Sequence, residues 1–294
     1  MTNLVQHVVA GLADGGIYSM LALALVLVHR ATGVLNFAQG EMGMFTTYIA
    51  WSLIYSAGIT YWPAFAITLA LAFGGGFVVY RIAIRPFAGR SPVTVVIVTV
   101  ALLVILNGAA GWIWSPQEKF FPSPFPLRVL HAGRIAVNVQ DLGVIGVSLA
   151  SAAVVFALFR YTRLGLQLRA SALGPATSRL LGIRVTLMLS IGWGLAAMLS
   201  AVAGMMAAQT LVLSPNYMLV VLTYAFAAAL LGGIDSPVGA VVGAYVLGVG
   251  LSLLGEYVGW VGSSLQLPVA LAVLVGVLVI RPAGLFGRVV VRRV

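Results

Sequence analysis

Long runs of apolar residues, separated by short polar or glycine-rich breaks, dominate this chain of 294 residues. A helix needs about 20 apolar residues to cross the roughly 30 Å hydrocarbon core of a bilayer. The runs lack the strict alternation that membrane barrel strands require, so they predict helices. Nine stretches qualify: Leu4–Val28, Ala38–Ala57, Tyr61–Ile84, Pro92–Trp114, Asp141–Phe159, Thr186–Ala208, Tyr217–Gly233, Val238–Leu254 and Leu265–Ile280.

The pattern predicts an all-α, polytopic membrane helix bundle of eight to nine transmembrane helices. The number stays open because the Ala38 or the Val238 stretch can be re-entrant. No linker or shift in composition divides the chain, so we expect a single transmembrane domain over residues 1–294.

Composition excludes the other broad classes of protein. Hydrophobic residues make up 62% of the chain and charged residues only 7%, whereas soluble domains carry roughly 25% charged residues. A soluble enzyme, a disordered chain and a nucleic-acid binder are therefore all excluded, and the lipid bilayer is the expected surrounding.

Candidate catalytic chemistry is sparse. The chain has no cysteine, six acidic residues and three histidines. His7, His29 and His131 lie in or beside different spans, with no metalloprotease-like or serine-hydrolase-like spacing around them. We expect no catalytic residue, no metal and no cofactor in this chain, and an intramembrane enzyme is strongly disfavoured.

Arginine distribution predicts the orientation, because cytoplasmic loops of membrane proteins are enriched in basic residues. The basic groups follow the third, fifth and last spans: Arg81, Arg85, Arg90; Arg160, Arg163, Arg169, Arg179, Arg184; and Arg281, Arg288, Arg292, Arg293. We therefore expect residues 160–184 and the C-terminus in the cytoplasm. The links at Ala57–Tyr61, Ser214–Asn216 and Glu256–Gly262, and the proline-containing loop of residues 115–140, are expected outside, together with the N-terminus.

The segment Asn36–Met42 places two amides and a carboxylate between two apolar runs. Such groups are costly at membrane depth and persist where they face a cavity or one another. One interpretation is an interfacial cap, with Asn36 as the N-cap and Glu41 in the first turn of the helix. The other is that the opened backbone and these side chains line a translocation route.

A second polar segment, Arg163–Ile183, lies in the predicted cytoplasmic loop. Pro175 suits the first position of a helix, and Gly182 suits the left-handed residue after a helix end. The sequence predicts a short helix over Pro175–Leu181 that exposes Arg179 and Leu180. An ordinary basic loop would not need a capped helix with apolar residues, so contact with a cytoplasmic partner is favoured.

Two glycine-containing polar breaks, Asn36–Gly43 and Ile234–Gly243, each lead into a helix rich in small residues. Paired breaks of this kind in the two halves of a transporter point to the substrate path. The ending Arg281–Gly287 has the arginine, proline and glycine of a membrane exit.

Five motifs follow one another along the chain: Gly16–Met20, Asn36–Glu41, Arg169–Leu180 with Gly182 and Ile183, Gly232–Ala240 and Arg281–Gly287. Together and in this order, they resemble the LivH-type permease subunit of branched-chain amino acid ABC importers. Gln39 stands where many relatives have histidine, Gly174 replaces a usual Asp or Asn, and Arg179 replaces a small residue. Because urea and short-amide importers share the motifs, both substrate classes stay open.

The resemblance implies a location in the bacterial inner membrane and four partner components. These are a second permease subunit of the LivM type, two cytoplasmic ATPase subunits that carry ATP and magnesium, and an extracytoplasmic substrate-binding protein. It implies a translocation path along Asn36, Phe37, Gln39, Gly40, Glu41, Gly233, Asp235 and Ser236. It also implies ATPase coupling through Arg169, Ala170, Ala172, Pro175, Arg179, Leu180, Gly182 and Ile183.

A secondary transporter that works without ATP is the main rival, because proton- or ion-coupled carriers place acids deep in the bundle. Asp14, Glu41, Asp235 and Glu256 are the acids available for such a role. Most of them lie near predicted helix ends, so the importer interpretation is preferred.

Overall fold

The computed structural model describes residues 2–126, 128–132, 135–258, 265–281 and 284–287, and it is mainly helical. Each of the nine apolar stretches forms a helix. The corresponding helices are α1 (Thr2–Thr32), α2 (Gln39–Tyr55), α3 (Tyr61–Val79), α4 (Pro92–Trp114), α5 (Val139–Tyr161), α8 (Val185–Leu211), α9 (Tyr217–Gly232), α10 (Pro237–Tyr257) and α11 (Gln266–Ile280). The prediction of a bundle of apolar α-helices is confirmed.

Within the described residues, six helices are long and apolar enough to cross a bilayer. They cover Leu4–Thr32, Tyr61–Phe87, Pro92–Trp114, Val139–Tyr161, Val185–Leu211 and Pro237–Tyr257. The helix that begins at Tyr61 reaches Phe87 because α3 continues into a π-helical turn, η1 (Tyr80–Ile84), and a 3-10 turn, η2 (Arg85–Phe87). Shorter apolar helices cover Tyr217–Gly232 and Gln266–Val277.

Two further helices and a hairpin lie between the long helices. Helices α6 (Arg163–Leu173) and α7 (Pro175–Leu180) follow α5. Strands β1 (Val129–Ala132) and β2 (Ile135–Asn138) pair antiparallel within the loop of residues 115–140. The membrane bundle is all-α, as predicted, and the hairpin is an addition to it in the loop. The sequence does not reveal the hairpin, because its eight strand residues carry no long apolar pattern.

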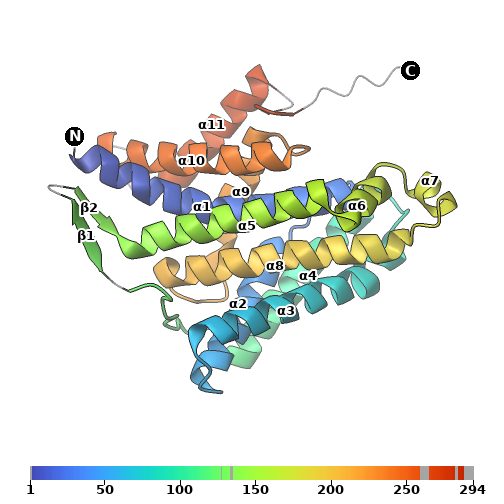
Figure 1. Ribbon diagram of the computed structural model, residues 1–294, viewed down its shortest axis with the longest axis horizontal. Helices are drawn as coiled ribbons and strands as arrows, with labels where there is room; N and C mark the ends of the chain where they lie inside the picture. The colour runs from blue at the N-terminus through green and yellow to red at the C-terminus, as the bar shows by residue number, and fades with distance from the viewer. Residues whose placement is uncertain (1, 127, 133–134, 259–264, 282–283, 288–294) are drawn as a thin grey trace.

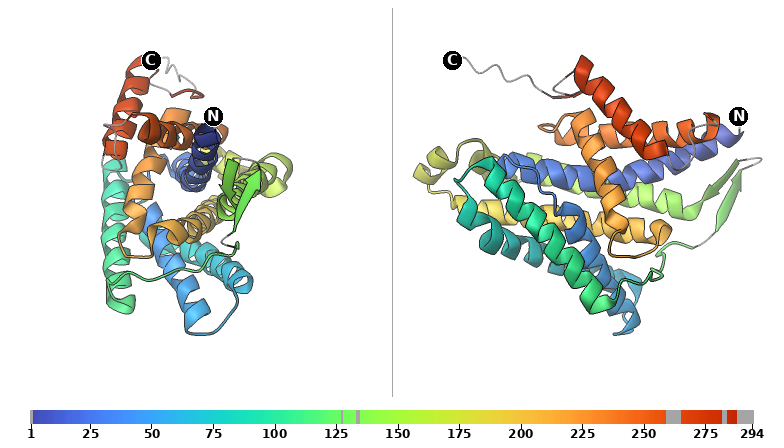
Figure 2. Two further views of the ribbon diagram at one scale, coloured as in Figure 1. Left: turned by 90° about the vertical axis from the view of Figure 1, so that its left-hand side faces the viewer. Right: turned by 180° about the vertical axis from the view of Figure 1, so that it is seen from behind.

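Different elements lie at the two ends of the molecule's long axis. The N-terminus and the β1–β2 hairpin lie at one end, and α6 and α7 lie at the other (Figure 1). Helices α1, α5, α8 and α10 run side by side along this axis, whereas α4, α9 and α11 cross it obliquely (Figure 2). The predicted exit after Arg281 is only partly described, since Pro282, Arg288, Arg292 and Arg293 lie outside the described residues, as do residues 259–262 of the last predicted outer link.

Burial is distributed as expected for a membrane protein. Helix α1 packs against α5, α8, α9 and α10 at the centre, and its Leu21 and Leu25 are fully buried. Peripheral α4 instead exposes Val104, Ile105 and Trp112, the last by 88%. An apolar face of this size is stable against lipid and not against water, so the periphery is the lipid-facing surface.

Small residues allow the central helices to approach closely, which is the usual device where lipid supplies no hydrophobic drive for association. A Cβ atom added at Gly248 of α10 would lie 2.6 Å from Gly15 Cα of α1, and would also meet the Gly11 carbonyl oxygen. By contrast, a Cβ atom added at Gly250, on the same helix, would have nothing within 4 Å.

This difference predicts that the same substitution, glycine to alanine, has different effects on stability at two sites of α10. Gly248→Ala should destabilise the detergent-solubilised protein by about 1–3 kcal/mol, because the added methyl group overpacks the contact with α1. Gly250→Ala should be neutral or slightly stabilising, because alanine favours helix. Thermal unfolding followed by intrinsic fluorescence measures both, and equal shifts in Tm would show that the α1–α10 contact is wrong.

Candidate functional site

The start of α2 carries a buried polar network. Asn36, Gln39 and Glu41 are fully buried. Asn36 Nδ2 donates to Gln39 Oε1 at 2.7 Å. Gln39 Nε2 donates to Ser200 Oγ at 2.6 Å and to the Ala196 carbonyl oxygen at 3.0 Å, both on α8. The two side-chain amides of this segment therefore form hydrogen bonds with each other and with α8.

The network lies well inside the bundle. Because Ala196 is the twelfth residue of α8, the contact lies about 16 Å along a helix that is about 40 Å long. Further along α2, Gly43 packs on Ser200 and Thr47 lies beside Gly204. Helix α2 therefore runs parallel to α8 from its middle toward its end, and begins at mid-bundle.

The interpretation of this segment as an interfacial cap is wrong, because Asn36 is not the N-cap residue of α2. Glu41 does lie in the first turn of α2, but the N-cap residue is Ala38, and no side-chain hydrogen bond caps the helix. Asn36 Oδ1 instead accepts from the Ala38 backbone N–H at 3.0 Å, which shapes the turn before the helix. The segment holds a helix start inside the bundle and not at its surface.

Glu41 connects α2 to α4 and to the start of α9. Asn107 Nδ2 of α4 lies 3.3 Å from Glu41 Oε2, and the same amide donates to the Pro215 carbonyl oxygen at 2.9 Å and to Asn216 Oδ1 at 3.0 Å. Glu41 Oε1 is buried with no hydrogen-bond partner in the part of the chain that the structure describes.

The remaining residues of the first segment face α9. The Phe37 ring lies 5.3 Å from the Phe226 ring, and Gly40 packs against Met218 and Leu222. Helix α9 is thus a shared neighbour of the two predicted path segments, because its C-terminal end leads into Gly233–Ser236.

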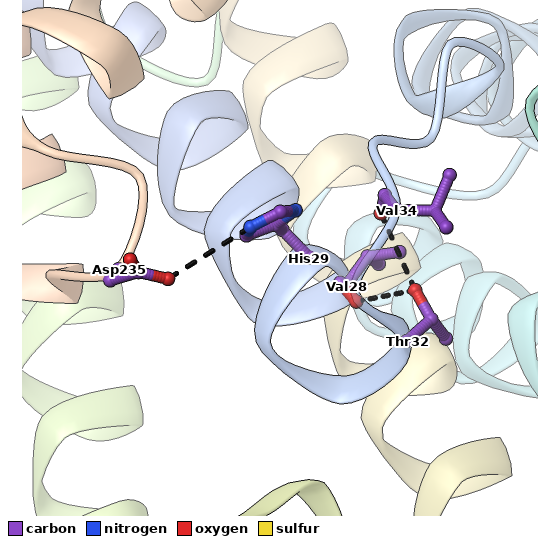
Figure 3. Close-up of polar contacts among 5 residues, drawn as sticks. All are labelled: Val28, His29, Thr32, Val34 and Asp235. Atoms are coloured by element: carbon purple, nitrogen blue, oxygen red, sulfur yellow. Dashed lines mark hydrogen bonds and ion pairs between the residues drawn. The ribbon is translucent and has the colours of Figure 1, made fainter. Parts of the chain in front are cut away.

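The second segment forms the turn between α9 and α10. Gly233 has a φ of 101°, in the region that favours glycine. Ser236 caps α10, since its Oγ accepts from the Gly239 backbone N–H at 3.0 Å. Asp235 points to the last turns of α1, where its Oδ1 lies 3.9 Å from His29 Nε2 (Figure 3). Across the described residues, no hydrogen bond or ion pair joins this turn to the Asn36–Glu41 segment.

A cavity of about 730 Å³ opens beside this turn. Its lining includes His29 and Arg30 of α1, Arg169 of α6, and Asp235 and Ser236 of the turn. The structure therefore brings predicted path residues and two predicted coupling residues, Arg169 and Ala172, into one cavity. His29 and Arg30 were not predicted as site residues, because only the long-range packing of α1 against the α9–α10 turn brings them to the cavity.

Helix α6 joins the predicted coupling segment to the bundle. Thr162 Oγ1 caps it by accepting from the Gly165 backbone N–H at 3.0 Å. Ala172 and Arg169 line the cavity, and Ala170 is half-buried. The sequence pattern does not predict this helix, because its mixture of polar and apolar residues resembles that of an ordinary basic loop.

Helix α7 confirms the short helix predicted at Pro175–Leu181. Pro175 stands in its first turn, and Gly182 follows its end with a φ of 78°. Leu180 is 89% exposed and Arg179 is also exposed. Gly182, which is exposed, and Ile183, which is half-buried, close the end of α7, because their backbone N–H groups donate to the Arg179 and Ser178 carbonyl oxygens at 3.0 and 2.9 Å.

The chain matches the family model described as branched-chain amino acid transport system / permease component, over residues 7–280. The chain belongs to this family. Its relatives include the high-affinity branched-chain amino acid transport system permease protein BraD of Pseudomonas aeruginosa, 30% identical over 99% of this chain and 98% of BraD. The Escherichia coli K12 protein LivH, of the same description, is 28% identical over 98% of this chain and 97% of LivH.

A further relative is the probable branched-chain amino acid transport permease protein LivH of Methanocaldococcus jannaschii, which is 28% identical over 91% of this chain and 88% of its own length. No solved structure matches the chain. In this permease-family chain, the described residues contain no group of three or more His, Asp or Glu side chains placed to hold a metal ion.

Proposed function

We propose that the chain is the membrane-spanning permease subunit of an ATP-driven importer of branched-chain amino acids in the bacterial inner membrane. The match to the permease family over residues 7–280 carries this proposal. The apolar bundle with lipid-facing α4 and α5 supports a role in the membrane. Hydrolysis of ATP with magnesium is assigned to two separate cytoplasmic ATPase subunits and not to this chain.

In this proposal α6 and α7 face the cytoplasm, while the N-terminus and residues 115–140 face outward. Two observations support the assignment. The arginine-rich segment of residues 160–184 lies at the end of the molecule opposite to the N-terminus and the hairpin (Figure 1). The positive-inside rule then places the arginine-rich end in the cytoplasm. All nine apolar helices enter the membrane, with α2 starting at mid-bundle, and the C-terminus is cytoplasmic.

ATPase coupling is assigned to the exposed tip of residues 173–181. Leu173, Leu180 and Leu181 are 84%, 89% and 75% exposed, respectively. Three such side chains at a predicted aqueous end favour burial by a partner, and Arg179 beside them supplies a charged contact. Helix α6 would transmit movement of this tip to the bundle through Arg169, Ala170 and Ala172.

Translocation is proposed as alternating access, in which packed helices shift as rigid bodies. Asn36, Gln39 and Glu41 are closed off by α8, α4 and α9 in the arrangement described here. They would meet substrate when α2 and α9 separate from α8. Asp235 and Ser236 already line an open cavity and form the inner part of the path.

The remaining partners follow from the same proposal. A second permease subunit of the LivM type would complete the membrane unit, and an extracytoplasmic binding protein would deliver substrate at the end that carries the hairpin. The importer's affinity for substrate would reside in that binding protein, because tight binding within the path slows release.

Purification of the tagged chain from its native membrane in mild detergent tests the assembly. We expect recovery of two nucleotide-binding subunits and a second permease, identified by mass spectrometry. Recovery of the chain alone, still active in liposomes without ATP, would contradict the proposal and favour a secondary transporter that uses the acids of the bundle.

A further inference from the structure

The cavity beside the α9–α10 turn combines two charges of opposite sign with an apolar wall. Arg30 and Arg169 supply guanidinium groups and Asp235 supplies a carboxylate, all at the lining of the same space. Its volume of about 730 Å³ falls within the range of small-molecule sites, about 300–1,000 Å³. A site built in this way complements a small molecule that is charged at both ends.

The positive groups are free to bind an anion. In the described part of the chain, neither Arg30 nor Arg169 forms a salt bridge, since the two ion pairs found there involve His7 with Glu256 and His29 with Asp235. Arg169 Nε is buried and has no hydrogen-bond partner among the described residues. A buried donor without a partner costs free energy, and a carboxylate that accepts from it removes that cost.

The negative group is also accessible. The Asp235 side chain is 59% exposed, and its single ion pair, to His29 Nε2, is long at 3.9 Å (Figure 3). It can therefore accept from an ammonium group while it stays near His29. Ser236 Oγ already caps α10, so Asp235 is the principal acceptor at this side of the cavity.

Apolar side chains surround the charged groups. Leu27, Phe159, Leu168, Leu189 and Phe286 line the same cavity. An adjoining apolar slot of about 440 Å³ between α1, α5 and α10 shares Leu27, Arg30, Phe159 and Arg169 with it. A branched aliphatic side chain would fit against this wall, whereas a urea-like molecule would bury neither an apolar group nor a charge there.

We propose that this cavity binds the zwitterionic, branched aliphatic amino acid on the cytoplasmic side, and that amino acid bound there slows further uptake. The carboxylate lies at Arg30 and Arg169, the ammonium group at Asp235, and the side chain along the apolar wall. The inference rests on the proposed function for its substrate and its sidedness. An anionic lipid headgroup fits less well, because the exposed Asp235 carboxylate would repel a phosphate.

The test uses the complete importer in liposomes, with ATP inside and labelled leucine delivered from outside by the binding protein. Unlabelled leucine, 4-methylpentanoate or isoamylamine is enclosed inside, and the initial uptake rate is measured. We expect internal leucine to slow uptake at a concentration at least ten-fold lower than either analogue, because each analogue lacks one of the two charges.

Substitutions test the assignment of each charge. Arg30→Gln should raise the internal leucine concentration that halves uptake by about ten-fold, whereas Arg90→Gln, at an exposed arginine outside the cavity, should not change it. Asp235→Asn should narrow the difference between leucine and 4-methylpentanoate, because only leucine carries the ammonium group. A merely structural role of Asp235 would not change this ratio.

Several outcomes would overturn the inference. The inference is overturned if internal leucine does not slow uptake, or if all three compounds inhibit uptake equally. It is also overturned if Arg30→Gln changes only the dependence of uptake on anionic lipid. If the importer shows no ATP-dependent leucine uptake even without internal amino acid, the proposed function has failed instead. Equilibrium dialysis of labelled leucine against the purified complex then still tests the cavity, and absence of Arg30-dependent binding overturns the inference.

Discussion

Arg179→Glu combined with Leu180→Asp is expected to abolish ATP hydrolysis coupled to transport. Both side chains are exposed on α7, so the substitutions leave the bundle intact. They replace an apolar contact with a charge and reverse the charge beside it, which changes two features that a partner groove would recognise. We expect substrate-stimulated hydrolysis to fall to the basal level of the ATPase subunits, while the amount of inserted chain stays unchanged.

The matched control keeps the chemistry of the tip. Arg179→Lys with Leu180→Met preserves the charge and the apolar surface of α7, so coupling should largely survive. Stimulated hydrolysis and the amount of chain in the membrane are measured for both pairs. Stimulation that persists in the charge-reversed pair would show that α7 is not the docking surface for an ATPase.

Asn36→Leu and Gln39→Leu should each reduce uptake strongly without preventing assembly. Gln39→Leu removes the acceptor of the 2.7 Å hydrogen bond from Asn36 Nδ2 and both donated bonds to α8. Leaving a buried polar group without its partner costs about 1–3 kcal/mol. The start of α2, which lies at mid-bundle, would then be displaced, and its contact with α9 would be disturbed.

The two substitutions should be non-additive, because Asn36 and Gln39 share one hydrogen bond. The fold-reduction in uptake of the double variant is expected to be smaller than the product of the fold-reductions of the two single variants. Gln117→Leu, at an exposed position in the loop of residues 115–140, is the control for the same change of side chain. Uptake and the yield of assembled complex are measured together. Unchanged uptake in both single variants would move the path away from this segment.

Much of the fold was predictable, because apolar stretches long enough to span a bilayer have few alternatives to a helix. The predicted and observed bounds differ by a few residues, as for Asp141–Phe159 against Val139–Tyr161. Helix α7 was predictable because Pro175 and Gly182 mark its two ends locally. Such signals depend on neighbours in the sequence and not on tertiary packing.

The site was less predictable, because its geometry depends on contacts between distant segments. Gln39 and Ser200 lie 161 residues apart in sequence, and nothing local to either shows that α2 begins beside the middle of α8. The cavity likewise joins α1, α6 and the α9–α10 turn. Polar residue type identified Asn36, Gln39 and Asp235, but it did not show that the first two are closed off and the third is exposed.

Uptake of labelled leucine by the complete complex in liposomes tests whether this chain serves an ATP-driven importer of branched-chain amino acids. We expect leucine uptake that requires ATP and the binding protein, persists with a protonophore, and exceeds the uptake of labelled urea. Leucine uptake that needs no ATP and that a protonophore abolishes would contradict the proposed function and identify a secondary transporter. ATP-dependent uptake of urea in preference to leucine would retain the importer and overturn the substrate class.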